Sequence, residues 1–167
     1  MQDIENIYKE YSKLIFKYLF CLSHNAEIAE DLMQETFLCA VNNINKFKGN
    51  CKISSWLCQI AKHLWYKELK KIKKYNLVQI DDIMENLKDT DDLDETIENN
   101  ERKQELYNKI QMLKGNVRQV MDLRIIGEFS FRQIGDILGK NENWARVTYY
   151  RGKEQIRGGK DYEKSKL

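Results

Sequence analysis

The sequence predicts an all-α protein in which two small helical domains are joined by an acidic linker. Apolar residues recur every three or four positions in each patterned segment, which is the spacing of one helix face. The 167 residues include no proline, so nothing in the chain forces a break in a long helix. Lysine and arginine outnumber acids over residues 1–74 (12 against 8) and 106–167 (13 against 7), whereas residues 75–105 carry 3 against 11. Two basic blocks separated by an acidic one indicate two modules that face nucleic acid.

The composition argues against a membrane protein and against a metal or disulfide scaffold. Hydrophobic residues make up 42% of the chain and charged residues 32%, as in soluble globular proteins. No apolar run approaches the roughly 20 residues of a membrane span, and no signal-peptide pattern opens the chain, so we expect a cytoplasmic protein. Its four cysteines, Cys21, Cys39, Cys51 and Cys58, form no CxxC pair. We therefore expect no metal and no other cofactor.

Two amphipathic helices open the chain. Apolar residues from Ile4 to Leu22 recur every three or four positions, and residues 23–26 break the pattern. A second helix follows with one apolar stripe, which predicts its buried side. The stripe consists of Ala29, Leu32, Met33, Thr36, Phe37, Ala40, Val41 and Ile44.

The opposite side of this second helix carries what we call the acidic ridge, formed by Asp31, Gln34, Glu35 and Leu38. An acidic and amide surface that ends in a leucine suits docking on a basic protein surface, although a plain solvated face has the same pattern. The carboxylates have no His, Lys or metal-ligand partner at a compatible spacing, so acid–base catalysis is not predicted. No trio of nucleophile, base and orienting group can be assembled elsewhere, and we expect a protein that is not an enzyme.

A loop with a glycine turn, residues 47–52, precedes a third helix that Ser54 or Ser55 is expected to cap. Trp56 is expected in the core. The C-terminal half of the helix interleaves lysines with aromatic rings, of which Tyr66 is the best candidate for exposure. Cations follow phosphates and rings stack on unpaired bases, which favours nucleic-acid binding, but lysines also complement a helix C-terminus. The lysines are Lys62, Lys67, Lys70, Lys71, Lys73 and Lys74.

Residues 77–104 are expected to form the acidic linker, because they are short of aromatic residues and show no sustained periodicity. Two further helices, one that begins near Leu106 and one over residues 117–126, open the second domain, residues 105–160. Residues 161–167 form a polar tail.

A helix-turn-helix pattern closes the second domain. Ser130 and Gln133 predict a capping box at the start of a short helix, and Gly139 and Asn141 predict a turn and a cap before the next helix. In that next helix a narrow face with two very small residues is expected to lie against the preceding helix: Ala145, Tyr149, Gly152 and Ile156. The outward face suits a DNA major groove, although a hairpin with a solvated basic face has the same pattern. It carries Asn143, Arg146, Val147, Tyr150, Arg151 and Arg157.

Several motifs, in this order, resemble the extracytoplasmic-function (ECF) group of bacterial sigma factors. AEDLMQETF (Ala29 to Phe37) is similar to the signature of sigma region 2, and FKGNCKISSWLCQIAKHL (Phe47 to Leu64) is similar to its loop and promoter-melting helix. VRQVMDLRIIGEFSFRQIGDILG followed by NWARVTYYRGKEQI is similar to region 4. The resemblance implies an alternative sigma factor with region 2 over residues 1–76 and region 4 over residues 105–160. Such a factor lends promoter specificity to core RNA polymerase.

The resemblance also implies roles for individual residues. The acidic ridge would dock on the clamp helices of the polymerase β′ subunit, and region 4 would rest on the β-subunit flap. The −10 element, from which a base is flipped into a protein pocket, would be opened and read by Phe47, Lys48, Asn50, Lys52, Lys62, His63, Tyr66 and Lys70. The −35 element would be read by Asn143, Trp144, Arg146, Val147, Tyr150 and Arg151, with Arg124 and Ser130 as phosphate contacts.

A further implied partner is an anti-sigma factor, which in this group is often bound to the membrane. His63 and Lys67 stand where the family commonly has Asn and Asp, so the −10 base preference is not carried over. Two other functions stay open at this point. A dimeric helix-turn-helix regulator would leave the acidic ridge unexplained, and a polymerase-binding adaptor that reads no promoter would not need Arg146 or Tyr150.

Overall fold

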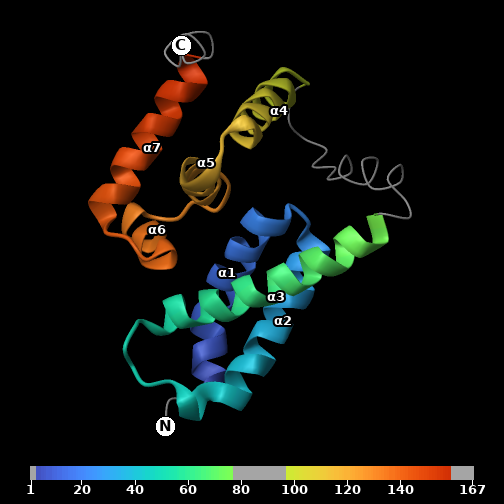
Figure 1. Ribbon diagram of the computed structural model, residues 1–167, viewed down its shortest axis with the longest axis vertical. Helices are drawn as coiled ribbons and strands as arrows, with labels where there is room; N and C mark the ends of the chain where they lie inside the picture. Colours follow the sequence, from blue (N-terminus) through green and yellow to red (C-terminus); the bar gives the residue numbers. More distant parts are fainter. Residues whose placement is uncertain (1–2, 77–96, 159–167) are drawn as a thin grey trace. The chain divides into compact units, whose positions relative to one another are not determined.

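The structure is a computed structural model that describes residues 3–76 and 97–158. Over these two ranges the chain is helical without any β-strand, which confirms the predicted all-α class (Figure 1). The chain divides into two compact units, unit 1 over Met1–Thr90 and unit 2 over Asp91–Leu167. Among the described residues, no helix is both long enough and apolar enough to cross a membrane.

Unit 1 is a bundle of three long helices in which each helix contacts the other two (Figure 1). Its centre is filled by Ile15 and Leu19 from the first helix and by Leu57 and Cys58 from the third, each at most 2% exposed. Burying each of the leucine and isoleucine side chains stabilises the bundle by about 1.5–3 kcal/mol. The elements are α1 (Ile4–Ser23), α2 (Ala26–Asn43), the short 3-10 helix η1 (Ile44–Lys46) and α3 (Ile53–Asn76).

The predicted break between the first two helices is a tight two-residue corner. His24 ends α1 in the left-handed conformation (φ 52°), and its N–H donates to the Phe20 carbonyl oxygen at 2.8 Å. Asn25 then caps α2, because its Oδ1 accepts from the Ile28 N–H at 3.0 Å. The corner reverses the chain so that α2 packs along α1.

Two predictions about unit 1 are wrong. Val41 was expected in the buried stripe of α2, but its side chain is 44% exposed because it lies roughly 100° around the helix axis from the centre of that stripe. Neither Ser54 nor Ser55 caps α3, because the helix begins at Ile53. The Trp56 N–H donates to the Lys52 carbonyl oxygen at 3.0 Å, so both serines lie within the first helical turn.

None of the four cysteines, all of them in the described part of the chain, forms a disulfide. Cys21 and Cys58 are buried, and burial raises the pKa of the Cys58 thiol to about 12. A thiol with so high a pKa stays protonated and unreactive at neutral pH. Cys39 is half-buried on α2 and Cys51 is exposed in the loop before α3.

Unit 2 is built around the predicted helix-turn-helix, α6 and α7, with α7 also packed on α5. Part of the predicted linker is helical, because α4 begins at Ile97; residues 77–96 of that linker lie outside the described residues. The expected single helix over 117–126 is an α-helix that changes to a π-helix at Asp122. The elements are α4 (Ile97–Met112), α5 (Gly115–Met121), the π-helical segment η2 (Asp122–Ile126), α6 (Phe131–Leu138) and α7 (Glu142–Arg157).

The caps of the helix-turn-helix are confirmed. Ser130 and Gln133 form a reciprocal capping box on α6, and Gly139 ends this helix in the left-handed conformation (φ 69°). Asn141 caps α7 through its Oδ1, which accepts from the Trp144 N–H at 2.7 Å. The predicted inner face of α7 needs one correction: Gly152 faces α5, because a Cβ there would lie 2.6 Å from the Met121 sulfur.

Gly135 sets the distance between α6 and the turn that follows it. A Cβ built at this residue would lie 2.8 Å from the Lys140 carbonyl oxygen and 2.9 Å from that of Asn141. These are backbone atoms of the turn between α6 and α7, so they cannot rotate away as a side chain can. The small residue at this position therefore allows α7 to follow α6 so closely.

We expect Gly135→Val to lower the free energy of unfolding of unit 2 by about 2–4 kcal/mol, because the turn must shift to admit the side chain. Hydrogen exchange of the unit 2 amides in the full chain measures this loss, with the amides of unit 1 as an internal reference. Arg132→Val at an exposed position of the same helix is the control for β-branching and should cost less than about 1 kcal/mol. Equal losses in the two variants would contradict the steric explanation.

Candidate docking and nucleic-acid interfaces

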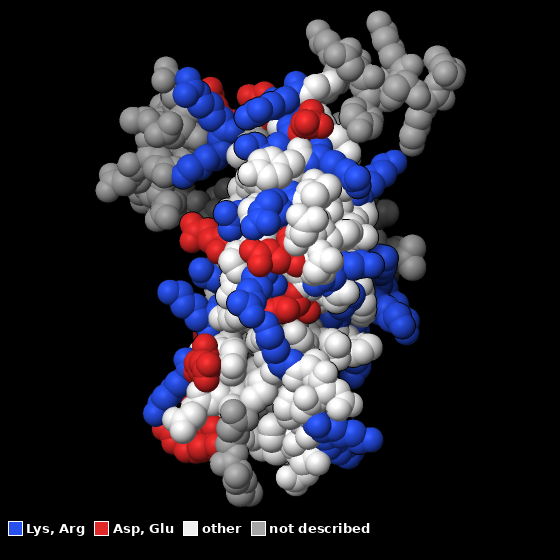
Figure 2. Space-filling model, turned by 90° about the vertical axis from the view of Figure 1, so that its left-hand side faces the viewer, with Lys and Arg blue, Asp and Glu red and all other residues white. Residues whose placement is uncertain are grey.

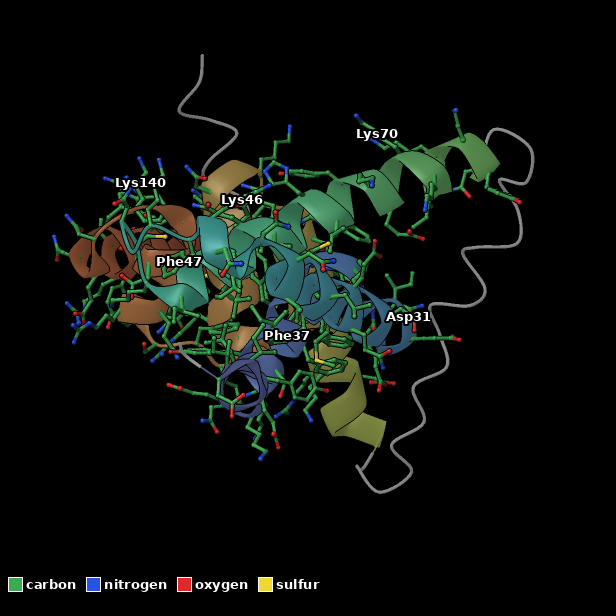
Figure 3. All side chains as sticks on the ribbon, turned by 90° about the horizontal axis from the view of Figure 1, so that it is seen from below. Asp31, Phe37, Lys46, Phe47, Lys70 and Lys140 are labelled. Atoms are coloured by element: carbon green, nitrogen blue, oxygen red, sulfur yellow. The ribbon has the colours of Figure 1, made fainter. Side chains whose placement is uncertain are left out.

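The acidic ridge lies on the outer side of α2. Asp31, Gln34, Glu35 and Leu38 are all exposed, and the Leu38 side chain is 66% exposed. Figure 3 shows Asp31 toward the start of α2, at the end of the bundle away from the loop that holds Phe47. The other side of α2 is fixed in the core, where the Phe37 ring meets the Tyr8 ring at 4.9 Å. The ridge is therefore a preformed surface on a rigid helix.

The loop before α3 is anchored at one residue and exposed at the others. The Phe47 ring packs against the Trp56 ring with 5.0 Å between the ring centres, so Phe47 is half-buried and holds the loop to α3. Gly49 adopts a left-handed conformation (φ 72°) that favours glycine. Lys48, Asn50 and Lys52 are exposed. Trp56, which was expected in the core, is half-buried and shares this contact.

A surface cavity of about 380 Å³ opens between α2, η1 and α3. Its walls are mainly apolar, with a thiol, an amide and two basic side chains at the edge. Of the residues predicted to touch nucleic acid, only His63 reaches it. The lining residues are Cys39, Asn43, Lys46, Trp56, Ile60, His63 and Leu64.

The second half of α3 presents basic side chains and aromatic rings on one exposed face. His63, Tyr66 and Lys70 lie three and four positions apart and are all exposed, and the Tyr66 side chain is 47% exposed (Figure 3 labels Lys70). The Lys62 Nζ lies 5.8 Å from the centre of the Tyr66 ring, which is within range of a cation–π contact. The predicted exposure of Tyr66 is confirmed.

The outward face of α7 is exposed as the pattern predicted. Val147 is 41% and Tyr150 is 52% exposed, and the Arg146 Nη2 donates to Glu142 Oε1 at 3.1 Å. Trp144 is only half-buried, and the Lys140 Nζ lies 5.8 Å from its ring centre. Figure 2 shows the Lys and Arg side chains in blue and the Asp and Glu side chains in red, both exposed at the surface. The remaining predicted residues of α7, Asn143 and Arg151, are exposed as well.

The two predicted phosphate contacts already serve the local structure. The Arg124 Nη1 donates to the Phe129 carbonyl oxygen at 2.9 Å, which closes the loop between the π-helix and α6. The Ser130 hydroxyl accepts from the Gln133 N–H at 3.1 Å as the cap of α6. An arginine has five N–H donors, so one internal bond leaves it able to meet a phosphate.

A buried carboxylate joins α4 to the π-helix. Asp122 accepts from Gln111 Nε2 at 3.2 Å, and the Arg118 Nε lies 3.9 Å from its other oxygen. Burial raises the pKa of Asp122 to about 6, while Arg118 and the Gln111 hydrogen bond act in the opposite direction. The raised pKa means that the fold accommodates the neutral form better than the charged form.

This carboxylate makes the stability of unit 2 depend on pH. The pKa of Asp122 is about 6 in the fold against an ordinary value of 3.8, so its contribution is greatest below pH 4 and is lost as the pH rises through 6. Asp122→Asn removes the charge and should stabilise unit 2 at pH 7 by about 1–2 kcal/mol. Hydrogen exchange at pH 5 and pH 7 measures both effects. If the free energy of unfolding of unit 2 changes between pH 5 and pH 7 as much in Asp122→Asn as in the wild type, Asp122 is not the group responsible.

Comparisons with known proteins show the family of this chain. Residues 7–75, nearly all of the described part of unit 1, match the family model of sigma-70 region 2. The RNA polymerase sigma factor YlaC of Bacillus subtilis is 30% identical over 157 residues, which cover 93% of this chain and 90% of that protein. The chain belongs to the ECF group of sigma-70-type RNA polymerase sigma factors. It is an alternative sigma factor for transcription initiation, as its motifs predicted.

Other relatives of this ECF sigma factor span both of its units. The ECF sigma factor SigX of Bacillus subtilis is 26% identical, and the match covers 93% of this chain and 82% of SigX. SigM of the same organism is 24% identical, and the match covers 92% of this chain and 93% of SigM. The co-crystal structure of the sigma factor RpoE with the anti-sigma factor NepR from Bartonella quintana matches 95% of this chain and 96% of the chain compared. Its TM-score is 0.60 at 16% identity, which shows a common fold.

Sequence reasoning missed several residues of these surfaces in the ECF sigma factor. Cys39, Asn43, Lys46 and Ile60 come together only through the packing of α2 on α3. Phe131, which was predicted only as part of the apolar face of α6, contacts two of the arginines expected to meet DNA. A cavity wall formed by two helices has no signature in the periodicity of either helix alone.

Proposed function

We propose that this ECF sigma factor binds core RNA polymerase through the acidic ridge and holds the two promoter elements with its two units. The observation that carries the proposal is the ridge itself. Two carboxylates and an amide lead along α2 to a leucine that is 66% exposed, and the other side of this helix is buried in the bundle. Charged groups at the edge of such a patch steer a basic partner toward it, and the leucine supplies apolar contact area. The β′ clamp helices are the partner that the family resemblance implies.

Unit 1 is proposed to open and read the −10 element with α3 and its preceding loop. Lys62 and Lys70 can follow the backbone of a single strand, while Tyr66 and His63 offer exposed rings. Stacking of one base on an aromatic ring contributes about 1–3 kcal/mol. The cavity of about 380 Å³ beside His63 supports the proposal, because a base turned out of the stack needs an apolar recess with polar groups at its rim.

Unit 2 is proposed to read the −35 element with α7 in the major groove. The N-terminal half of a recognition helix contacts base edges, and here it carries Asn143, Arg146 and Val147. These types suit adenine, guanine and the thymine methyl group, respectively. Tyr150 and Arg151 follow one turn later. Arg124 in the π-helix and Ser130 at the cap of α6 are the proposed phosphate contacts.

The remaining partners of the proposed function come from the family resemblance. The β-subunit flap would hold unit 2, and an anti-sigma factor, often membrane-bound in this group, would compete for the sigma factor. The protein would act in the cytoplasm, where polymerase and promoter are found. It would carry out no chemistry of its own and needs no cofactor, because melting and positioning rest on binding energy alone.

Selection of genomic DNA fragments tests the division of labour between the units. Fragments retained by core polymerase together with the chain, but by neither alone, should show two separate protected elements and permanganate-reactive thymines at the downstream one. Protection of symmetric half-sites by the chain alone would favour the dimeric regulator. Retention of fragments without any common sequence would favour the adaptor that reads no promoter.

A further inference from the structure

The ring of Phe131 lies close to two guanidinium groups that come from different elements of unit 2. The Arg124 Cζ, from the π-helix, is 4.3 Å from the centre of the ring, and the Arg146 Cζ, from α7, is 5.4 Å from it. Both distances fall within the range of about 6 Å over which an aromatic face attracts a cation. Phe131 itself is the first residue of α6, directly after the cap at Ser130.

Further contacts extend this cluster along α7. The Phe131 ring meets the Tyr149 ring at 5.4 Å, and Tyr149 meets Tyr150 at 5.6 Å. The Lys153 Nζ lies 5.7 Å from the centre of each tyrosine ring. A connected set of rings and cations therefore runs from the π-helix, across the start of α6, to the middle of the recognition helix.

Each of the two arginines also forms a hydrogen bond within unit 2. The Arg124 guanidinium donates to the Phe129 carbonyl oxygen at 2.9 Å, and the Arg146 guanidinium donates to Glu142 at 3.1 Å. A flexible arginine loses up to about 2 kcal/mol of rotamer entropy when it is immobilised on a ligand. A side chain already held by a ring and a hydrogen bond has less of this entropy to lose.

We propose that Phe131 is a positioning residue for promoter recognition: its ring holds Arg124 and Arg146 in place before DNA binds, so that the two arginines engage DNA together. This inference rests on the proposed reading of the −35 element by α7. It adds a residue that need not touch DNA and links a phosphate contact at the π-helix to a base contact on the recognition helix. The bulk of the apolar anchoring of α6 comes from Ile134, which is fully buried, and not from Phe131, which is half-buried.

The test compares Phe131→Leu, which keeps apolar bulk but removes the ring, with Phe131→Tyr, which keeps the ring. Binding of the full chain with core polymerase is measured on a labelled promoter duplex taken from a mapped start. The leucine variant should bind about 5-fold more weakly, as expected for the loss of two exposed cation–π contacts, and the tyrosine variant should stay within about 2-fold of wild type.

A double-mutant comparison separates positioning from a merely structural effect. In an Arg124→Ala/Arg146→Ala background, Phe131→Leu should change the affinity by less than about 2-fold, because no guanidinium is left to position. An equal loss with and without the arginines would overturn the inference, as would a tyrosine variant as weak as the leucine variant.

A readout without DNA keeps this inference distinct from the proposed function. In the free full chain, ring currents should shift the Arg124 and Arg146 side-chain proton signals upfield in the wild type and the tyrosine variant, but not in Phe131→Leu. Unshifted arginine signals in the wild type would overturn the inference even if promoter recognition is correct. Shifted signals with no promoter binding by wild-type chain and polymerase would instead count against the proposed function.

Discussion

Replacing Gln34 and Glu35 together with alanine should weaken binding of the chain to core RNA polymerase by about 10- to 100-fold, as expected when two central contacts of an interface are truncated. Both side chains are exposed on α2, so their removal deletes an amide and a charge from the acidic ridge without opening the core. Alanine is also the best helix former, and the free energy of unfolding should change by less than about 0.5 kcal/mol. Fluorescence anisotropy of the labelled chain, titrated with core polymerase, measures the affinity.

Glu30→Ala is the matched control for this loss. Glu30 is an exposed carboxylate one position before Asp31 and lies roughly 90° around the axis of α2 from the centre of the ridge, on the side of Gln34. The control removes the same formal charge as the Glu35 substitution, so it accounts for any general effect of net charge on the encounter rate. Its affinity for polymerase should stay within about 2-fold of wild type. Equal weakening by Glu30→Ala and by the ridge variant would show that charge, not the ridge, controls binding.

Replacing Arg146 and Tyr150 with alanine should lower transcription from a promoter with an intact −35 element by about 10- to 100-fold. One arginine that forms two hydrogen bonds to a guanine contributes about 1–3 kcal/mol of discrimination between bases. Both side chains are exposed on the outward face of α7, and neither contributes to its buried side. The decisive quantity is the ratio of transcripts from promoters with intact and scrambled −35 elements. This ratio should fall toward one in the variant.

Arg157→Ala provides the control for the loss of a positive charge from α7. Arg157 is exposed on the same side of the helix but three turns beyond Arg146, away from the end expected to contact bases. Removal of the Arg157 charge should lower transcription from both promoters to the same small extent, because a contact with a phosphate does not depend on the base sequence. A variant of Arg146 and Tyr150 that behaves in this same way would remove the base-reading role assigned to them.

The surfaces on single helices could be predicted from the sequence because residues three or four positions apart lie on the same face of a helix. The acidic ridge, the outward face of α7 and the exposure of Tyr66 each follow from residues three or four apart. Helix caps were predicted where a side chain bonds within its own turn, as at Ser130 and Asn141. These features need no knowledge of what packs on the other side.

The features that escaped prediction depend on contacts between elements. Val41 fits an apolar stripe in the sequence, yet only the position of the neighbouring helices decides how wide the buried sector of α2 is. Gly152 is small in order to admit α5, whose approach is invisible in the pattern of α7. Arg124 was predicted as a phosphate contact, but its bond to the Phe129 carbonyl and its place on the Phe131 ring require three-dimensional closure of the loop.

Transcription in vitro by core RNA polymerase on a library of genomic fragments is the measurement that tests the central claim most directly. With the chain added, we expect new transcription starts that share sequence elements at −35 and −10. Those starts should be absent without the chain and with the Gln34→Ala/Glu35→Ala variant. No chain-dependent starts from active core polymerase, or starts that persist undiminished with the ridge variant, would contradict promoter recognition through docking on the acidic ridge.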